Sequence, residues 1–184
     1  MGTIPTITTF TAGAVLTAAQ LNNMKAVSDF WALTPRCYAY QTAAQTLTTA
    51  VAAAIVLETE VYDIVQSGDS PSHDLVTNNS RVHVRTTGKY EVSGQVYYAT
   101  NATGTRSAEI RLNAAGAIGG GTRLSLNQQT AVSGVGTPAT APPIEAALSA
   151  GDYVEIFGTQ TSGGNLNTAG GSGLTFLRIR LTGS

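Results

Sequence analysis

The chain has a single cysteine, Cys37, and no long apolar run. One cysteine cannot form a disulfide within the chain or assemble a zinc site built from cysteines, so Cys37 is expected to be a small buried apolar residue. The longest apolar run covers residues 50–57, which is too short to cross a bilayer. The first residues also lack the basic region of a signal peptide. We therefore expect synthesis in a cytoplasm and no membrane insertion.

Charged residues are also scarce, at 11% of the chain against roughly 25% in typical soluble domains. The 10 Lys and Arg residues and the 11 Asp and Glu residues give a formal charge of −1, so there is no basic field to gather phosphates. Nucleic acid is not expected as a partner. The surface must consist mainly of Thr, Ser, Asn, Gln, Gly and Ala, while a hydrophobic content of 42% is enough for a packed core.

Few ionisable groups are left for a catalytic or metal site. The segment Ser72–Asp74 contains the serine, histidine and aspartate of a catalytic triad, but neighbours in an extended loop point in different directions. His83 alternates with two arginines on a strand, which is typical of a solvated or interface residue. Glu58 and Glu60 share one strand face, where a solvated edge is favoured and a Ca²⁺ site stays open. We expect no enzyme, no cofactor and no metal site.

The clearest pattern in the chain is the alternation along residues 87–98. Tyr90, Val92, Gly94 and the two residues that continue the pattern, Val96 and Tyr98, fall on one face, as expected for a strand. A second strand follows an Ala-Gly-Asp turn and carries large side chains on both faces. Such a strand should be covered by its own core on one side and by another sheet or subunit on the other. A single copy of the domain is therefore predicted to be incomplete.

Further short strands separated by turn signals are predicted after residue 36. They lie at residues 37–41, 54–63, 81–85, 107–113, 122–127, 144–148 and 174–181. The segment 128–143 is low in complexity and rich in Thr, Val, Gly, Ala and Pro, so we interpret it as an extended surface crossing rather than a core strand. No helical period follows Leu33. The pattern predicts an all-β sandwich, jelly roll or barrel.

The N-terminal part follows a different pattern. Its first residues alternate Thr with apolar residues and include Pro5, which predicts an extended arm. Thr17 and Gln20 have the spacing of a capping box, so a helix is predicted to begin there and to end near Leu33, before Pro35. A helix of this length is marginal alone in water, so it should dock through an apolar stripe. The attachment helix is expected to dock through Leu21, Met24, Val27, Phe30 and Trp31.

Four of the predicted strand segments share a pattern with a known fold family. They read G-x-Y-x-V-x-x-x-V-x-Y at residues 88–98, I-x-L-N at 110–113, L-x-A-G-D-x-V-x-I at 148–156 and L-x-F-L-x-I-x-L at 174–181. This set resembles the C1q and tumour-necrosis-factor-like jelly roll over residues 37–184. The resemblance implies an all-β, antiparallel jelly-roll sandwich, preceded here by the arm and one short α-helix. It also implies a homotrimer in which three copies close around an axis through one sheet each.

The segment 10–24 reads F-x-A-G-x-x-L-T-A-A-x-L-N-x-M. It is similar to the start of tail or head appendage proteins of bacteriophages, in which a G-x-x-L-T-A-x-x-L-N segment recurs. Together the two resemblances imply a structural virion protein, a trimeric capsid-decoration, head-fibre or tail-fibre component. Residues 1–35 would anchor it to other virion proteins, and residues 37–184 would project. The alternative is a receptor- or glycan-binding module of a tail tip, whose partner is a host-surface receptor. The expected location is the virion, after synthesis in the host cytoplasm.

The predicted homotrimer needs an interface. The two signature strands carry more aromatic surface than one core face needs, and exposed apolar faces favour association. We therefore expect the interface to include Tyr90, Val96, Tyr98, Tyr153 and Phe157. The outer loops at residues 66–73, 115–122 and 161–173 carry almost no aromatic residues, so we do not expect them to bind sugars tightly.

Overall fold

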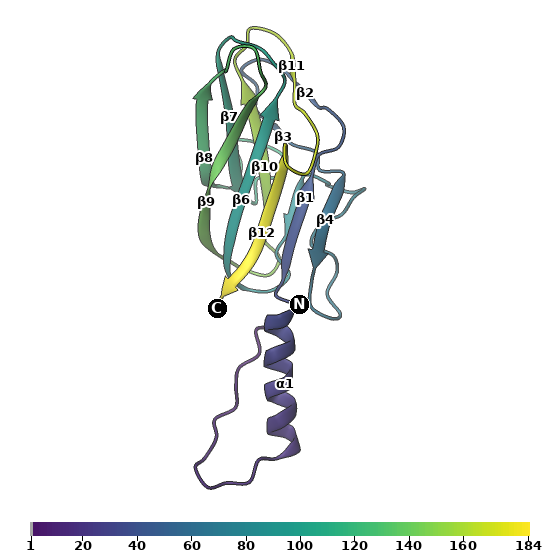
Figure 1. Cartoon of the computed structure of the whole chain (residues 1–184), viewed down its shortest axis with the longest axis vertical. Coiled ribbons are helices and arrows are strands. Elements are labelled where there is room, and N and C mark those ends of the chain that lie inside the picture. Colours follow the sequence, from purple (N-terminus) through teal and green to yellow (C-terminus); the bar gives the residue numbers. More distant parts are fainter. Residues whose placement is uncertain (1) are drawn as a thin grey trace.

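The structure, a computed structural model, describes residues 2–184 and consists of an antiparallel β-sandwich and a projecting N-terminal stalk (Figure 1). The elements in chain order are α1 (Ala18–Ala32), β1 (Arg36–Tyr40), β2 (Thr46–Leu47), β3 (Ala53–Ala54), β4 (Thr59–Ile64), β5 (Arg81–His83), β6 (Gly88–Tyr98), β7 (Thr105–Leu112), β8 (Thr122–Thr130), β9 (Thr137–Leu148), β10 (Tyr153–Gln160), β11 (Leu166–Asn167) and β12 (Phe176–Gly183).

The strands form two facing sheets and one short ladder. The first sheet has the order β4-β1-β12-β6-β9, and the second has the order β3-β10-β7-β8 with β5 paired to β10. β2 and β11 form the separate ladder. Every ladder between these strands is antiparallel. The predicted all-β sandwich is therefore confirmed.

β6 lies inside the first sheet, between β12 and β9, and its predicted alternation is confirmed. Its inward side chains, from Tyr90 to Tyr98, are buried between the two sheets. The Tyr90 hydroxyl donates to the Thr86 carbonyl at 2.7 Å, and the Tyr98 hydroxyl donates to the Ser107 carbonyl at 2.6 Å. Both buried hydroxyls thus have partners, as burial in an apolar core requires.

Two inward glycines let the sheets approach each other closely. Gly94 of β6 faces Ile110 and Ile156 of the second sheet. In the opposite direction, a Cβ atom on Gly158 of β10 would lie 2.8 Å from the Tyr98 hydroxyl oxygen. Because real Cβ contacts are longer than this, any larger residue at either position would push the sheets apart.

The predicted surface crossing at residues 128–143 is mostly strand, so that prediction is wrong. β8 ends and β9 begins within it, and β9 pairs with β6 along most of its length. Ala139 and Ala141 are fully buried, while Pro138 and Pro142 are exposed on the other face. β9 is the edge strand of its sheet, where proline is tolerated because no neighbour needs its missing N–H.

The predicted helix is present as α1 and begins with the predicted capping box. The Thr17 hydroxyl accepts from the Gln20 backbone N–H at 3.2 Å, and the Gln20 side chain accepts from the Thr17 N–H at 2.9 Å. Thr8 donates its N–H and its hydroxyl to the Asn23 side chain, so the extended arm lies along α1. Arm and helix form the stalk, residues 2–33, which projects beyond one end of the sandwich (Figure 1). No helix within residues 2–184 has the length and apolar content to span a bilayer.

The stalk is joined to the sandwich at two points. Phe30, near the end of α1, is 3% exposed and belongs to the core cluster of the sandwich. At the start of the arm, the Gly2 N–H donates to the Arg85 carbonyl at 3.2 Å, and Ile4 packs against the core. The predicted domain boundary between residues 35 and 37 stays a prediction, and the segment before it contributes side chains to the core.

Replacing Gly94 with alanine is expected to destabilise the protein by about 1–3 kcal/mol, because the sheets are already in contact there. The new methyl group would lie 2.7 Å from Ile156 Cδ1 and 2.9 Å from the Phe176 carbonyl oxygen, so the backbone of β12 must shift. Gly119→Ala is the matched control, because a Cβ there meets no atom within 4 Å. Urea unfolding of both variants measures the effect. Equal stability of the two would contradict close sheet packing.

Candidate functional site

The outward face of the first sheet carries a cluster of aromatic rings where β4, β1 and β12 run side by side. Tyr38 of β1 lies between Tyr62 of β4 and Phe176 of β12, with ring centroids 5.9 Å and 5.2 Å away in edge-to-face geometry. All three rings are half-buried within the single chain. Clustered apolar surface of this kind marks a site that a partner can cover. We call these three residues the aromatic face.

The composition of β1 explains why these rings point outward. Cys37 and Ala39 are the inward residues and are fully buried, while Tyr38 and Tyr40 alternate with them on the outer face. Burial raises the pKa of the Cys37 thiol above its ordinary value, and nearby carboxylates add to the effect, so the thiol stays protonated and unreactive. The predicted role of Cys37 as a small buried residue is confirmed. The small-large alternation along β1 is the sequence signal that could have revealed the aromatic face.

Charged side chains border the aromatic face. The Arg36 guanidinium carbon lies 5.6 Å from the centre of the Tyr62 ring. Glu91 of β6 pairs with Arg178 at 3.8 Å and with Arg180 at 3.5 Å. A depression of about 270 Å³ lies between Tyr62 and these three charged residues. Since the pairs are long and solvent-exposed, they hold their geometry weakly and can rearrange when a partner covers them.

The residues predicted to form the trimer interface do not make one exposed surface. Tyr90, Val96 and Tyr98 point between the sheets and are 0–1% exposed. Phe157 lies on the other side of the second sheet, alternating with the inward Ile156, and is also fully buried. For these four residues the prediction is wrong, because a side chain buried within one chain has no surface to offer another. Their aromatic area is used inside the chain.

Tyr153, the fifth predicted interface residue, is half-buried and already has partners within the chain. Its hydroxyl accepts a hydrogen bond from the Ala115 N–H at 3.0 Å, and the Arg81 guanidinium carbon lies 4.6 Å from the ring centre. The ring also lies 5.5 Å from that of His83. Burial and the neighbouring arginines lower the pKa of His83, so this histidine is neutral near pH 7. Tyr153 and the aromatic face belong to different sheets.

The residues predicted to dock the helix divide into three groups. Leu21, Met24 and Trp31 are exposed, as a docking role requires. Val27 is half-buried. Phe30 packs in the core cluster of the sandwich, so the prediction that it docks on another molecule is wrong. Its function is to hold the stalk on its own domain.

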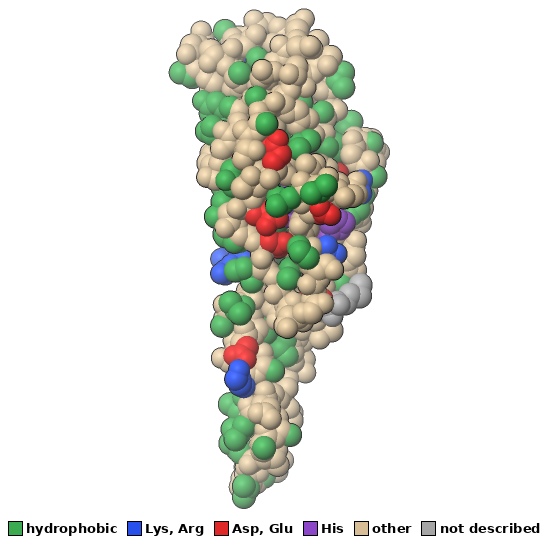
Figure 2. Space-filling view, turned by 90° about the vertical axis from the view of Figure 1, so that its right-hand side faces the viewer, with side chains coloured by type: hydrophobic (Ala, Val, Ile, Leu, Met, Phe, Trp, Pro, Cys, Tyr) green, Lys and Arg blue, Asp and Glu red, His purple; other side chains and the backbone are tan. Residues whose placement is uncertain are grey.

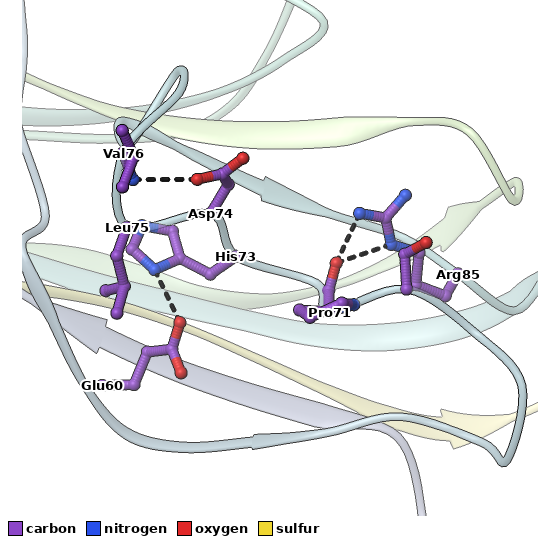
Figure 3. Close-up of a pocket in the computed structure, with 8 residues that line it drawn as sticks. Glu60, Pro71, His73, Asp74, Leu75, Val76 and Arg85 are labelled. Carbon is purple, nitrogen blue, oxygen red and sulfur yellow. Dashed lines mark hydrogen bonds and ion pairs between the residues drawn. The ribbon is translucent and has the colours of Figure 1, made fainter.

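The loop between β4 and β5 buries His73 beside a pocket of about 410 Å³ (Figure 3). His73 Nδ1 lies 3.0 Å from Glu60 Oε1, and Nε2 lies 3.0 Å from the Asn79 carbonyl oxygen. Both ring nitrogens therefore have partners other than Ser72 and Asp74. The three adjacent residues do not form a catalytic triad. His73 instead connects the loop to β4.

The nearby carboxylates also have separate structural partners. Glu58 Oε2 accepts from the Thr42 N–H at 2.6 Å and the Ala43 N–H at 2.9 Å. Partial burial acts to raise the pKa of Glu58, but these two N–H groups and the Thr42 hydroxyl together outweigh it and hold the pKa below its usual value. Glu60 contacts His73 instead, so the two acids do not act as a pair. Within residues 2–184, no three His, Cys, Asp or Glu side chains converge as metal ligands would.

Comparisons with known proteins bear on the fold. No family model matches the chain, and no curated protein matches it in sequence. Among solved structures, Eiger TNF from S. frugiperda has a TM-score of 0.60 at 19% identity, over 82% of this chain and 94% of that one. Murine APRIL has a TM-score of 0.56 at 13% identity, over 80% and 99%. The globular domain of zebrafish complement 1qA has a TM-score of 0.52 at 10% identity, over 82% and 99%. The sandwich therefore has the C1q/TNF-like jelly-roll fold, as the sequence resemblance implied.

Proposed function

We propose that the protein is a structural virion component, a trimeric capsid-decoration or fibre protein anchored through its N-terminal segment. The observation that carries the proposal is the shape of the chain, in which a stalk with exposed apolar side chains projects from one end of a β-sandwich (Figures 1 and 2). The similarity of residues 10–24 to bacteriophage appendage proteins supports the same assignment. The protein would be located in the virion after synthesis in the host cytoplasm.

The aromatic face supports the trimer. The resemblance to C1q and tumour necrosis factor implies that one sheet of each copy faces the axis, and the first sheet is the one with clustered, half-buried rings on its outer side. Covering Tyr38, Tyr62 and Phe176 would remove apolar surface from water at a gain of about 25 cal/mol per Å². The surrounding arginines outnumber Glu91, and arginine is enriched at protein interfaces.

The tip of the stalk supports attachment to another virion protein. Ile7, Phe10, Val15 and Leu16 lie in the arm and the turn before α1, and all four are exposed, Val15 by 90%. The arm turns back into α1 at the end of the stalk that is far from the sandwich (Figure 1). Four exposed apolar side chains on the arm and the turn of a projecting stalk favour burial against another protein. We infer that this tip is the anchor.

The far end of the sandwich does not favour the alternative of receptor or glycan binding. Its loops, residues 41–52, 99–104, 131–136 and 161–175, contain no charged and no aromatic residue. Figure 2 shows this end of the visible face without acidic, basic or histidine side chains. Tight protein contacts rely on Trp, Tyr and Arg anchors, which these loops lack. Of the three outer loops considered in the sequence, 161–173 lies at this end (Figure 1). The loop 66–73 does not, because the Gln66 side chain donates to the carbonyl of the stalk residue Leu33.

The oligomeric state tests the role of the aromatic face. Sedimentation equilibrium at micromolar concentration is expected to give three times the chain mass of 18.9 kDa. Tyr62→Lys should weaken association by about 100-fold or more, because it would bury an unpaired charge next to Arg36. Val76→Lys is the control, because Val76 is 88% exposed and lies outside the aromatic face. A wild-type monomer, or a Tyr62→Lys variant that associates like the control, would remove this interface.

Binding of the protein to the virus particle tests whether the tip of the stalk is the anchor. A chain that starts at residue 29 keeps Phe30 and the sandwich, so it is expected to fold with lowered thermal stability and to lose binding to the particle. Purified virions incubated with the full or shortened chain are examined by electron microscopy with an antibody against the sandwich. Full-length Val76→Lys serves as a control that should still bind. Binding by the shortened chain would place the anchor elsewhere, and absence of the native protein from purified virions would refute the virion assignment.

Glycan recognition is expected to be absent. The wild-type trimer should give no signal above background on a glycan array, because the far loops have neither rings to stack on sugars nor charges to pair with acidic ones. Asn165→Ala serves as the paired variant, since Asn165 is exposed in the loop after β10. If the wild type binds a specific glycan and this variant does not, the receptor-binding alternative is favoured instead.

A further inference from the structure

The exposed apolar residues of α1 form a narrow seam. Leu21, Met24, Ser28 and Trp31 are spaced by three, four and three residues, which is the spacing of the a and d positions of a coiled coil. They occupy about 80° of the helix circumference at 3.6 residues per turn. Leu21, Met24 and Trp31 are 51%, 44% and 42% exposed, and Ser28 is exposed as well. We call these four residues the α1 seam.

The remaining faces of α1 are either covered by the chain or exposed with mainly polar side chains. Asn23 accepts two hydrogen bonds from Thr8 of the arm, and Phe30 is buried in the core cluster. Lys25 and Asp29, the charged residues of α1, pair with each other. The seam is thus the apolar strip of this helix that the chain itself leaves open.

The size of the seam limits what can occupy it. Three apolar side chains that each expose about half of roughly 200 Å² offer about 300 Å² in total. A stable interface needs about 800 Å² from each partner, so the seam cannot hold a separate protein by itself. It can act only as the extension of a larger contact. α1 leads into β1 through the short connection 33–35, and β1 carries Tyr38 of the aromatic face.

We propose that the α1 helices of three copies pack against one another along their seams, as a short parallel bundle that extends the trimer of the sandwiches. The inference rests on the proposed trimer, because copies that meet through their aromatic faces bring the starts of their β1 strands, and hence the ends of α1, to the same end of the assembly. Rotational symmetry makes the helices parallel. The seam contains no charge, so the contact buries none. Mutual packing also stabilises a helix that is marginal alone.

A cysteine scan of α1 tests the bundle in the full-length protein. Ser28→Cys places a nearly isosteric thiol in the seam, and Asn22→Cys places one about 120° away on the helix. Cys37 is fully buried and does not compete. Under copper-catalysed oxidation, Ser28→Cys is expected to give covalent dimers at least tenfold faster than Asn22→Cys. Unchanged melting temperatures under reducing conditions show that both variants fold.

Sedimentation equilibrium of the same samples measures the oligomeric state, so a failure of the helix bundle can be distinguished from a failure of the proposed trimer. A trimer in which Ser28→Cys does not cross-link, or reacts with a maleimide as fast as Asn22→Cys, would overturn the bundle and leave the trimer intact. Equal cross-linking of both variants would also overturn the bundle, because it indicates random collision. A wild-type monomer would overturn the trimer on which the bundle rests.

Discussion

The close contact between β6 and the second sheet determines where most other parts of the sandwich lie. Gly94 lets the sheets meet at Ile110 and Ile156, and the gap left between them is filled by the inward side chains of β6. Tyr90 and Tyr98 are the largest of these. Burial raises the pKa of Tyr90 to about 12, so its hydroxyl stays a hydrogen-bond donor to the backbone. β6 therefore uses these two tyrosines internally, and neither is available for association.

β1 connects the two surfaces to which we assign association. It pairs with β4 and β12, which brings Tyr38 together with Tyr62 and Phe176, and it follows α1 after a short connection. A contact through the aromatic face therefore determines where the stalks of neighbouring copies start. The stalk divides accordingly into a part near the sandwich, fastened by Phe30, and a tip with exposed apolar residues. Self-association and attachment can thus use different residues of one short segment.

The few charges of the chain are used largely for internal contacts. Glu155 is fully buried and accepts hydrogen bonds from the Ser80 hydroxyl at 2.9 Å and the Gly116 N–H at 3.0 Å. Glu109 pairs with Arg111 at 2.7 Å and with an arginine of β8 at 2.9 Å. Buried carboxylates need such partners, because an unpaired charge in the core is costly. The end of the sandwich far from the stalk is left with hydroxyl and amide groups, which hydrogen-bond to water, and with methyl groups. None of these groups attracts a charged ligand.

The local structure of the chain could be predicted from its sequence. Alternation at residues 88–98 predicted a strand and its inward face, the Thr17–Gln20 spacing predicted the helix start, and the strand motifs predicted the jelly roll. What covers each face of a strand depends on contacts between distant parts of the chain. Alternation shows that a strand has two faces, but it does not show what packs against either face. For this reason the buried Tyr98 was assigned to an interface, and the Ala-Thr alternation of β9 was interpreted as a surface segment. Tyr38 and Phe176 are more than a hundred residues apart in sequence, and only strand pairing brings them together.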